Sequence, residues 1–143
     1  MRITPHFTLQ EMIVSQIASR EGLINTPTPQ VITNLHLLCQ ALEQVRALFA
    51  RPVIVSSGYR SAELNARIGG SSRSQHMTGL AADFGVVGIS HREVVHRISK
   101  SNVEFDQLIL EFDSWVHLSV SPSAPRREVL TIRRGTGYMS GLK

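Results

Sequence analysis

The apolar stripe between residues 31 and 49 constrains the fold of this chain more than any other feature of its sequence. Apolar residues recur there at alternating intervals of four and three positions, which is the period of one face of an α-helix. Thr28 followed by Pro29 is typical of an N-cap and a first helical position. The pattern predicts a long helix that ends near Ala50 and buries one face, including the single cysteine, Cys39. The stripe consists of Val31, Leu35, Leu38, Leu42, Val45 and Phe49.

Shorter segments predict the remaining elements. Residues 8–11 and 90–93 have the sequence of capping boxes, which begin helices. Several later segments have the β-branched and aromatic composition of strands, and the turn at Asp113–Ser114 joins two of them as a hairpin. Because helices come first and neighbouring strands follow, we expect one α+β domain over residues 1–143, with an antiparallel sheet and flanking helices. The strand segments lie within 51–61, 80–87, 105–112, 115–120 and 127–134.

Length and hydropathy exclude a membrane protein. No apolar run approaches the ~20 residues that span a bilayer, and the first twelve residues lack the apolar stretch of a secretory signal. We therefore expect no transmembrane segment and synthesis in the cytoplasm without a signal peptide. We also expect a monomer.

The net charge of +4 comes entirely from the carboxyl-terminal tail, residues 124–143. Residues 1–123 contain equal numbers of basic and acidic side chains, whereas the tail contains five basic residues and one acidic residue. A basic tail suits an anionic partner such as a wall polymer, and the alternative is a solvated edge strand. We expect no nucleic-acid partner, because no aromatic RNA-binding motif or base-reading helix accompanies the tail.

Two of the six histidines, His76 and His117, occur in contexts that favour a functional role. His76 lies in a loop rich in glycine and serine, ahead of the strand that contains Asp83. In the strand 115–120, alternation places His117 on the face opposite the apolar residues. The other four histidines are expected at the surface: His6, His36, His91 and His96.

Asp83 interrupts an otherwise apolar strand, and a buried lone carboxylate is unfavourable unless it is paired or binds a metal. Two imidazoles and one carboxylate are the protein ligands of a catalytic zinc ion with a fourth position open for water. Such an ion lowers the pKa of water and polarises a carbonyl. The spacing alone leaves an alternative open, in which His76 caps the loop and Asp83 pairs with an arginine.

Several spaced motifs resemble one family along nearly the whole chain. Ser74, His76, Gly79, Ala81 and Asp83 meet the pattern Ser-x-His-x-x-Gly-x-Ala-x-Asp, and "WVH" at 115–117 follows later. With "SGYRS" at 57–61, these segments resemble the M15 family of zinc D-Ala-D-Ala carboxypeptidases, in its small phage- or prophage-encoded branch.

This resemblance implies the D-Ala-D-Ala peptidase or hedgehog-like zinc peptidase fold and gives the candidate residues roles. The zinc (Zn²⁺) ligands would be His76, Asp83 and His117. Arg60 would face the substrate and the developing oxyanion; the alternative is a structural arginine that bridges Asp83 or a turn carbonyl. The further substrate-binding candidates are Ser74, Gln75 and Trp115; Ser74 has the equal alternative of a bond within its own loop.

The general base is the point at which the sequence departs from the family. An acidic residue three positions before the last histidine ligand is replaced here by Ser114. The catalytic candidates are Glu111 and Asp113. We favour Glu111, because it ends an apolar strand paired with the strand of His117, whereas aspartate is common in turns. If neither carboxylate reaches the site, the protein binds zinc without hydrolysis.

The resemblance implies a zinc metallopeptidase that cleaves peptidoglycan stem peptides, at D-Ala-D-Ala or at a cross-link. Without a signal, such an enzyme would reach the cell wall through a phage holin or as part of a virion. Two alternatives stay open. One is an L-Ala-D-Glu endopeptidase, and the other is a non-catalytic, zinc-stabilised structural or binding protein such as a virion component.

Overall fold

A computed structural model describes residues 1–143, which fold into helices and a mixed sheet. This α+β class confirms the prediction from the order of the elements. No helix has the length and apolar character to cross a membrane. The helices are α1 (Leu9–Ile13), α2 (Gln16–Glu21), α3 (Pro29–Phe49), α4 (Ala62–Arg67), the 3₁₀ helix η1 (Gln75–Thr78) and α5 (His91–Ser99). The strands are β1 (Arg2–Thr4), β2 (Phe7–Thr8), β3 (Val53–Ser57), β4 (Ala81–Val86), β5 (Gln107–Glu111), β6 (Trp115–Ser119), β7 (Glu128–Ile132) and β8 (Met139–Ser140).

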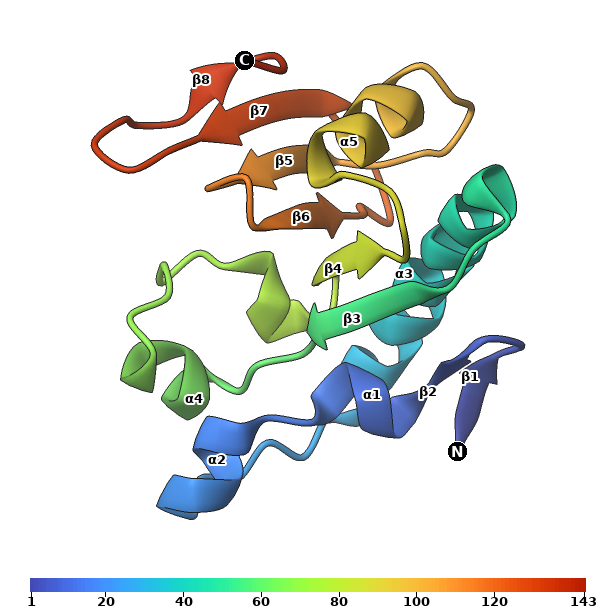
Figure 1. Ribbon diagram of the computed structural model, residues 1–143. Helices are drawn as coiled ribbons and strands as arrows, with labels where there is room; N and C mark the ends of the chain where they lie inside the picture. The colour runs from blue at the N-terminus through green and yellow to red at the C-terminus, as the bar shows by residue number, and fades with distance from the viewer.

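The main sheet has the strand order β3-β4-β6-β5-β7-β8 (Figure 1). Four of its neighbouring pairs are antiparallel as expected, but β5 and β7 are parallel. The parallel pairing of β5 and β7 follows from the position at which β6 ends in the sheet. Leu118 lies opposite Leu108, so the chain leaves β6 at the end of the sheet where β5 begins. It then enters β7 from that same end, where Glu128 lies opposite Gln107.

The long helix α3 agrees with its sequence pattern. The Thr28 hydroxyl accepts a hydrogen bond from the Val31 amide, Pro29 occupies the first turn, and Ala50 ends the helix with a left-handed φ of 53°. All six residues of the predicted stripe are buried, together with Cys39. The capping box of Thr8 and Glu11 is also present at the start of α1.

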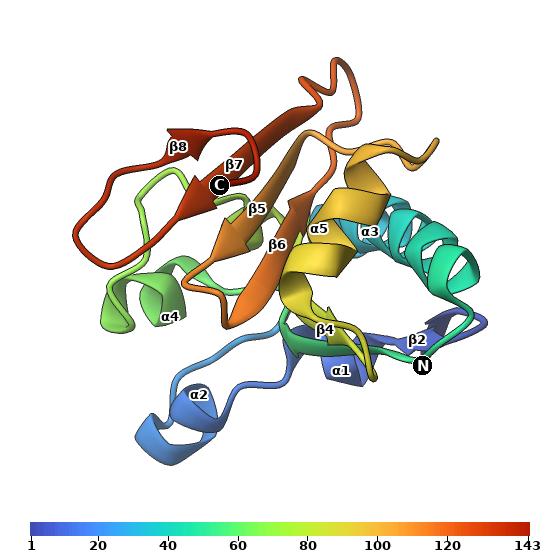
Figure 2. The same ribbon diagram turned by 45° about the horizontal axis from the view of Figure 1, so that its top comes forward.

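The two faces of the sheet have different roles. Helices α3 and α5 both pack against one face, while α4 and η1 lie on the other side (Figure 2). Because side chains alternate along a strand, the residues toward α3 and α5 are apolar and the intervening residues point away from that core. The face toward α3 and α5 presents Ala82, Phe84, Val86, Leu108, Leu110, Val116 and Leu118.

The basic tail is attached to the body of the protein by three of its arginines. Arg126 binds Asp106 with its side chain, at 2.7 Å between Nη2 and Oδ2. Arg127 donates to backbone carbonyls and lies over the Phe105 ring. Arg133 pairs with a carboxylate of the β5–β6 turn. These contacts hold the tail against the protein, and β7 pairs with both β5 and β8, so the expected solvated edge strand is wrong for β7.

Asp106 supplies a pH-dependent part of the stability. Hydrogen bonds from Arg126 are the main reason that the pKa of this buried carboxyl falls to about 2. The ordinary value is about 3.9, so the charged form stabilises the fold above pH ~4 and this contribution decreases as the pH falls toward 2. We predict that Asp106→Asn lowers the free energy of unfolding by about 2 kcal/mol at pH 7 and by about half of that at pH 3. Urea denaturation measures both values.

The matched control is Glu21→Gln, which removes the partner of Arg67 in a surface ion pair. Because both side chains of that pair are at least one-third exposed, the change should stay below about 0.5 kcal/mol. An equal destabilisation by Asp106→Asn at pH 7 and pH 3 would contradict the electrostatic origin of the effect.

Candidate metal centre

Asp83 and His117 meet because their strands are adjacent and in register. Asp83 lies directly opposite His117 in the antiparallel pair of β4 and β6, and both side chains point away from the helix-covered face. The Oδ1 atom of Asp83 is 3.1 Å from Nδ1 of His117. Ser119 and Trp115 occupy the same face of β6, as strand alternation predicted.

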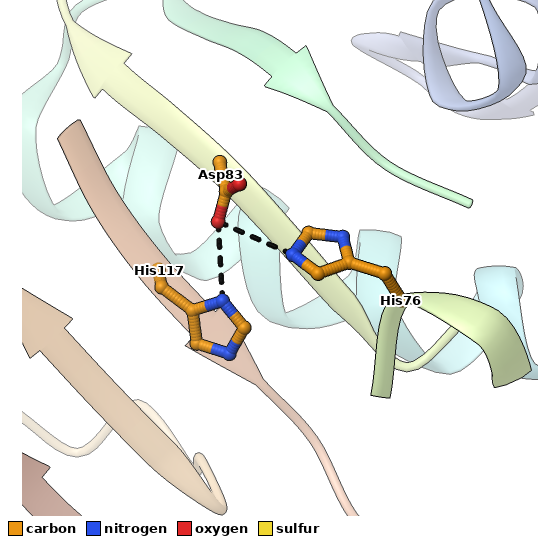
Figure 3. A group of neighbouring side chains, drawn as sticks. All are labelled: His76, Asp83 and His117. Carbon is orange, nitrogen blue, oxygen red and sulfur yellow. Dashed lines mark hydrogen bonds and ion pairs between the residues drawn. The ribbon is translucent and has the colours of Figure 1, made fainter. Parts of the chain in front are cut away.

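His76 reaches the same carboxylate from outside the sheet. It lies in η1, whose N-cap Ser74 accepts a hydrogen bond from the His76 amide and whose last residue precedes Gly79 at φ 78°. The Nε2 atom of His76 is 3.3 Å from Asp83 Oδ1. Figure 3 shows the two imidazoles converging on this oxygen from η1 and β6.

The ring of His76 is oriented by the backbone. Its Nδ1 is 2.7 Å from the carbonyl oxygen of Gly58, and a carbonyl only accepts, so Nδ1 carries the proton. In the neutral ring, Nε2 then carries the lone pair that a metal ion would bind. Metal-binding histidines in proteins are commonly oriented in this way, with the second ring nitrogen bonded to a carbonyl or carboxylate.

The electrostatics of the group suit a cation. Burial is the largest influence on His76 and lowers its pKa, which favours the neutral ring. Burial alone would raise the pKa of Asp83, but the adjoining imidazoles of His117 and His76 outweigh it and hold that pKa well below its usual range. One atom from each of the three residues lies within 4.8 Å of the others. Two imidazoles and one carboxylate with these spacings fit a zinc ion.

Glu111 lies beside this group and Asp113 does not. Glu111 Oε1 is 3.8 Å from His117 Nδ1, and the Trp115 indole N–H donates to Oε2 at 3.0 Å. Burial raises the pKa of Glu111. Asp113 is 56% exposed and pairs instead with Arg92 and Arg133. The structure therefore brings only the favoured carboxylate candidate to the predicted metal site.

Arg60 lies next to the metal group but is not paired with Asp83. Its amide donates to the His76 carbonyl at 3.0 Å, and its Nη2 donates to Ser74 Oγ at 3.3 Å. The Nε atom is buried and has no hydrogen-bond partner. A buried donor without a partner is unfavourable. The residue also lines the cleft in front of the metal group.

Ser74 and Gln75 are also predicted to bind substrate, and both already make hydrogen bonds within the protein. Ser74 Oγ accepts from both Arg60 and the His76 amide, so it orders the loop. Gln75 donates from its Nε2 to Asp106 Oδ2 at 3.0 Å. Each also lines the cleft, and their contact with a substrate stays a prediction.

A cleft of about 800 Å³ opens in front of the metal group. The sequence predicted five of its lining residues besides the ligands, and those it missed include Phe112, Arg126, Leu130 and Tyr138. Three of these belong to the tail, and only the parallel pairing of β7 with β5 brings them to the site. No local pattern in the sequence indicates that pairing.

Comparison with known proteins gave two matches. Residues 5–119 match a family model described as Peptidase M15. A shorter segment of 39 residues is 46% identical to a protein from Streptomyces albus G named zinc D-Ala-D-Ala carboxypeptidase. That segment covers 27% of this chain and 15% of the Streptomyces protein.

Gly58, whose carbonyl orients His76, packs closely against the backbone of Met12. A Cβ at this position would lie 2.3 Å from the backbone oxygen of Met12, so the backbone would have to shift, and its carbonyl would shift with it. We expect Gly58→Ala to lower the free energy of unfolding by about 2 kcal/mol. Because that carbonyl orients His76, zinc affinity should fall roughly 10- to 100-fold. Urea denaturation and competitive zinc titration measure the two effects.

Gly137→Ala is the control, since no atom lies within 4 Å of a Cβ placed there. Zinc affinity in Gly58→Ala equal to that of the control would show that the Gly58 carbonyl does not orient a metal ligand.

Proposed function

The chain belongs to the peptidase M15 family, and from that premise and the geometry of the site we propose that it is a zinc-dependent peptidase acting on peptidoglycan stem peptides. The α+β fold is consistent with this membership. The observation that carries the proposal is the position of Glu111, whose side chain is 15% exposed and whose Oε1 is 3.8 Å from Nδ1 of His117. A peptidase needs such a group to move a proton beside the attacked carbonyl.

The ligands in this proposal are His76, Asp83 and His117, whose three atoms converge in the cleft. When bound there, zinc supplies Lewis-acid chemistry, because it acidifies a water molecule and polarises the scissile carbonyl. The residual charge of a site with two neutral histidines and one aspartate is positive, which supports that chemistry.

Glu111 is the proposed general base and then the general acid. Its burial and raised pKa favour a carboxylate that accepts a proton from water and releases it to the leaving amine. The Trp115 indole fixes one carboxylate oxygen, Oε2, so Oε1 stays available on the side of His117. Arg60, which lines the cleft beside the metal ligands, is the proposed donor to the oxyanion.

The substrate class rests on the relative named zinc D-Ala-D-Ala carboxypeptidase and on the size of the cleft. We propose cleavage next to D-Ala, either at a free terminus or at a cross-link, with action on the cell wall during phage lysis. Cleavage of L-Ala-D-Glu is the alternative within the same chemistry. The tail is attached to the protein by Arg126, Arg127 and Arg133, so it supports an approach to the anionic wall less than its composition suggests.

Zinc binding should be stoichiometric and stabilising. We expect about one zinc ion per chain in purified protein, and a melting temperature that falls after chelation and recovers on addition of zinc. Replacement of His117 by alanine should abolish binding, whereas replacement of the half-buried surface residue His91 should not. Metal analysis and thermal unfolding test this, and the same zinc content in both variants would contradict the assigned ligands.

The variant Glu111→Gln should keep zinc but lose hydrolysis. Removal of the proton-transfer group lowers kcat by roughly 10²- to 10⁴-fold, while the three ligands remain in place. The control is Asp113→Asn, two residues away and outside the cleft, which should retain near wild-type activity. Release of D-Ala or of new amino termini from purified peptidoglycan is the measurement. Zinc-loaded wild-type protein that releases neither would favour a non-catalytic zinc-stabilised role, for which Ser114 is the supporting feature.

A further inference from the structure

The last part of the chain, residues 120–143, lies beyond the matched family region and completes one wall of the cleft. It contains β7 and β8, and β7 runs beside β5, the strand that ends in Glu111. Three cleft residues come from it: Arg126, Leu130 and Tyr138. This wall of the cleft is therefore formed by residues that follow the region matched by the family model.

Contacts at both ends hold this wall in place. At its start, Arg126 binds the buried carboxylate of Asp106. The same carboxylate also accepts a hydrogen bond from Gln75 in η1, the helix that contains His76. At its end, the buried Thr131 hydroxyl donates to the Gly141 carbonyl and accepts from the Lys143 amide. A wall fixed in this way binds a ligand without an ordering cost at the moment of binding.

The strand register places Tyr138 near Glu111. Glu111 lies opposite Ile132 in β7, and Thr131 lies opposite Met139 in β8. Tyr138 is one residue beyond that last pair, so its backbone falls on the row of Glu111 and Ile132, two strand spacings or about 10 Å from Glu111 across the sheet. Both side chains line the same cleft.

The two walls of the cleft differ in chemistry. The loop between α4 and η1 provides small and polar residues, namely Gly69, Gly70, Ser71, Arg73 and Ser74. The opposite side provides aromatic rings from Phe112, Trp115 and Tyr138. The Tyr138 residue is 61% exposed and Phe112 is 44% exposed, so this apolar surface is not part of the core. The segment joining β7 and β8 lies on the same side of the sheet as the α4–η1 loop in both views (Figures 1 and 2).

We propose that Tyr138 is a substrate-specificity residue whose ring packs against the leaving-group side of a bound stem peptide. The inference rests on the proposed function, since Glu111 is on the side where the leaving amine takes up its proton. The ring contacts the aliphatic and amide surface of the residue that follows the scissile bond. The phenol hydroxyl is not required for this contact.

Peptide binding can be measured without hydrolysis. Trp115 is the only tryptophan of the chain and lines the cleft, so its fluorescence reports an occupied site. The parent for this titration is zinc-loaded Glu111→Gln protein, and the further variants are made in the same background. Each protein is titrated with a stem pentapeptide that ends in D-Ala-D-Ala. We expect Tyr138→Ala to raise Kd roughly tenfold and Tyr138→Phe to change it by less than about twofold. Arg134→Ala, in the same turn but outside the cleft, should bind like the parent.

A second measurement addresses specificity. In the active background, Tyr138→Ala should alter the ratio of kcat/KM between the pentapeptide and a cross-linked peptide dimer, because the two differ in the group on the leaving side. Zinc content and melting temperature should stay at the parent values, since Tyr138 is an exposed side chain.

The outcomes separate the two proposals. An unchanged Kd in Tyr138→Ala, or no titratable binding of the pentapeptide to the parent, overturns the role of Tyr138. If wild-type protein cleaves neither peptide but binding still depends on Tyr138, the proposed hydrolysis fails while the recognition role stands. If wild-type protein cleaves and binding is indifferent to Tyr138, only the inference fails.

Discussion

The site depends on one carboxylate, Asp83, whose side chain is 14% exposed and lies between two imidazoles. A charged group removed from water requires compensating partners, and Asp83 has them at 3.1 and 3.3 Å. His117 comes from the adjacent strand, where it lies opposite Asp83. His76 comes from the short 3₁₀ helix η1, and the Gly58 carbonyl orients its ring. Loss of either partner would leave a buried charge without sufficient compensation. The geometry around Asp83 therefore couples the fold to the metal chemistry.

The sheet separates stability from chemistry by the alternation of its side chains. One face packs against α3 and α5 and forms the core, whereas the other carries the metal group, Glu111 and Trp115. Adjacent strands in register bring their side chains together on that second face without a long loop. The 3₁₀ helix η1 contributes His76 and the segment after β3 contributes Arg60, and each is held by a hydrogen bond with the backbone. This division allows polar and charged groups to gather at the site without disturbing the apolar core.

The sequence predicted what depends on local pattern and short-range pairing. The period of α3 follows from helix spacing and the faces of β6 from strand alternation. The choice of Glu111 over Asp113 follows from the hairpin pairing of its strand and from the frequency of aspartate in turns. The parallel pairing of β7 with β5 did not follow, because it depends on where β6 ends in the sheet. For that reason Tyr138 and Leu130 were not recognised as cleft residues. The anchoring of the basic tail by Asp106 was also hidden, since these residues are twenty positions apart in the chain.

X-ray absorption at the zinc edge of the loaded wild-type protein tests the assignment of His76, Asp83 and His117 as zinc ligands. We expect two imidazole nitrogens at about 2.0 Å and oxygen ligands at about 2.0–2.2 Å, without sulfur. We also expect that one imidazole contribution disappears in His117→Ala protein that has been forced to retain zinc at high concentration. A spectrum with a sulfur ligand from Cys39, or with no imidazole contribution, would contradict the proposed metal site.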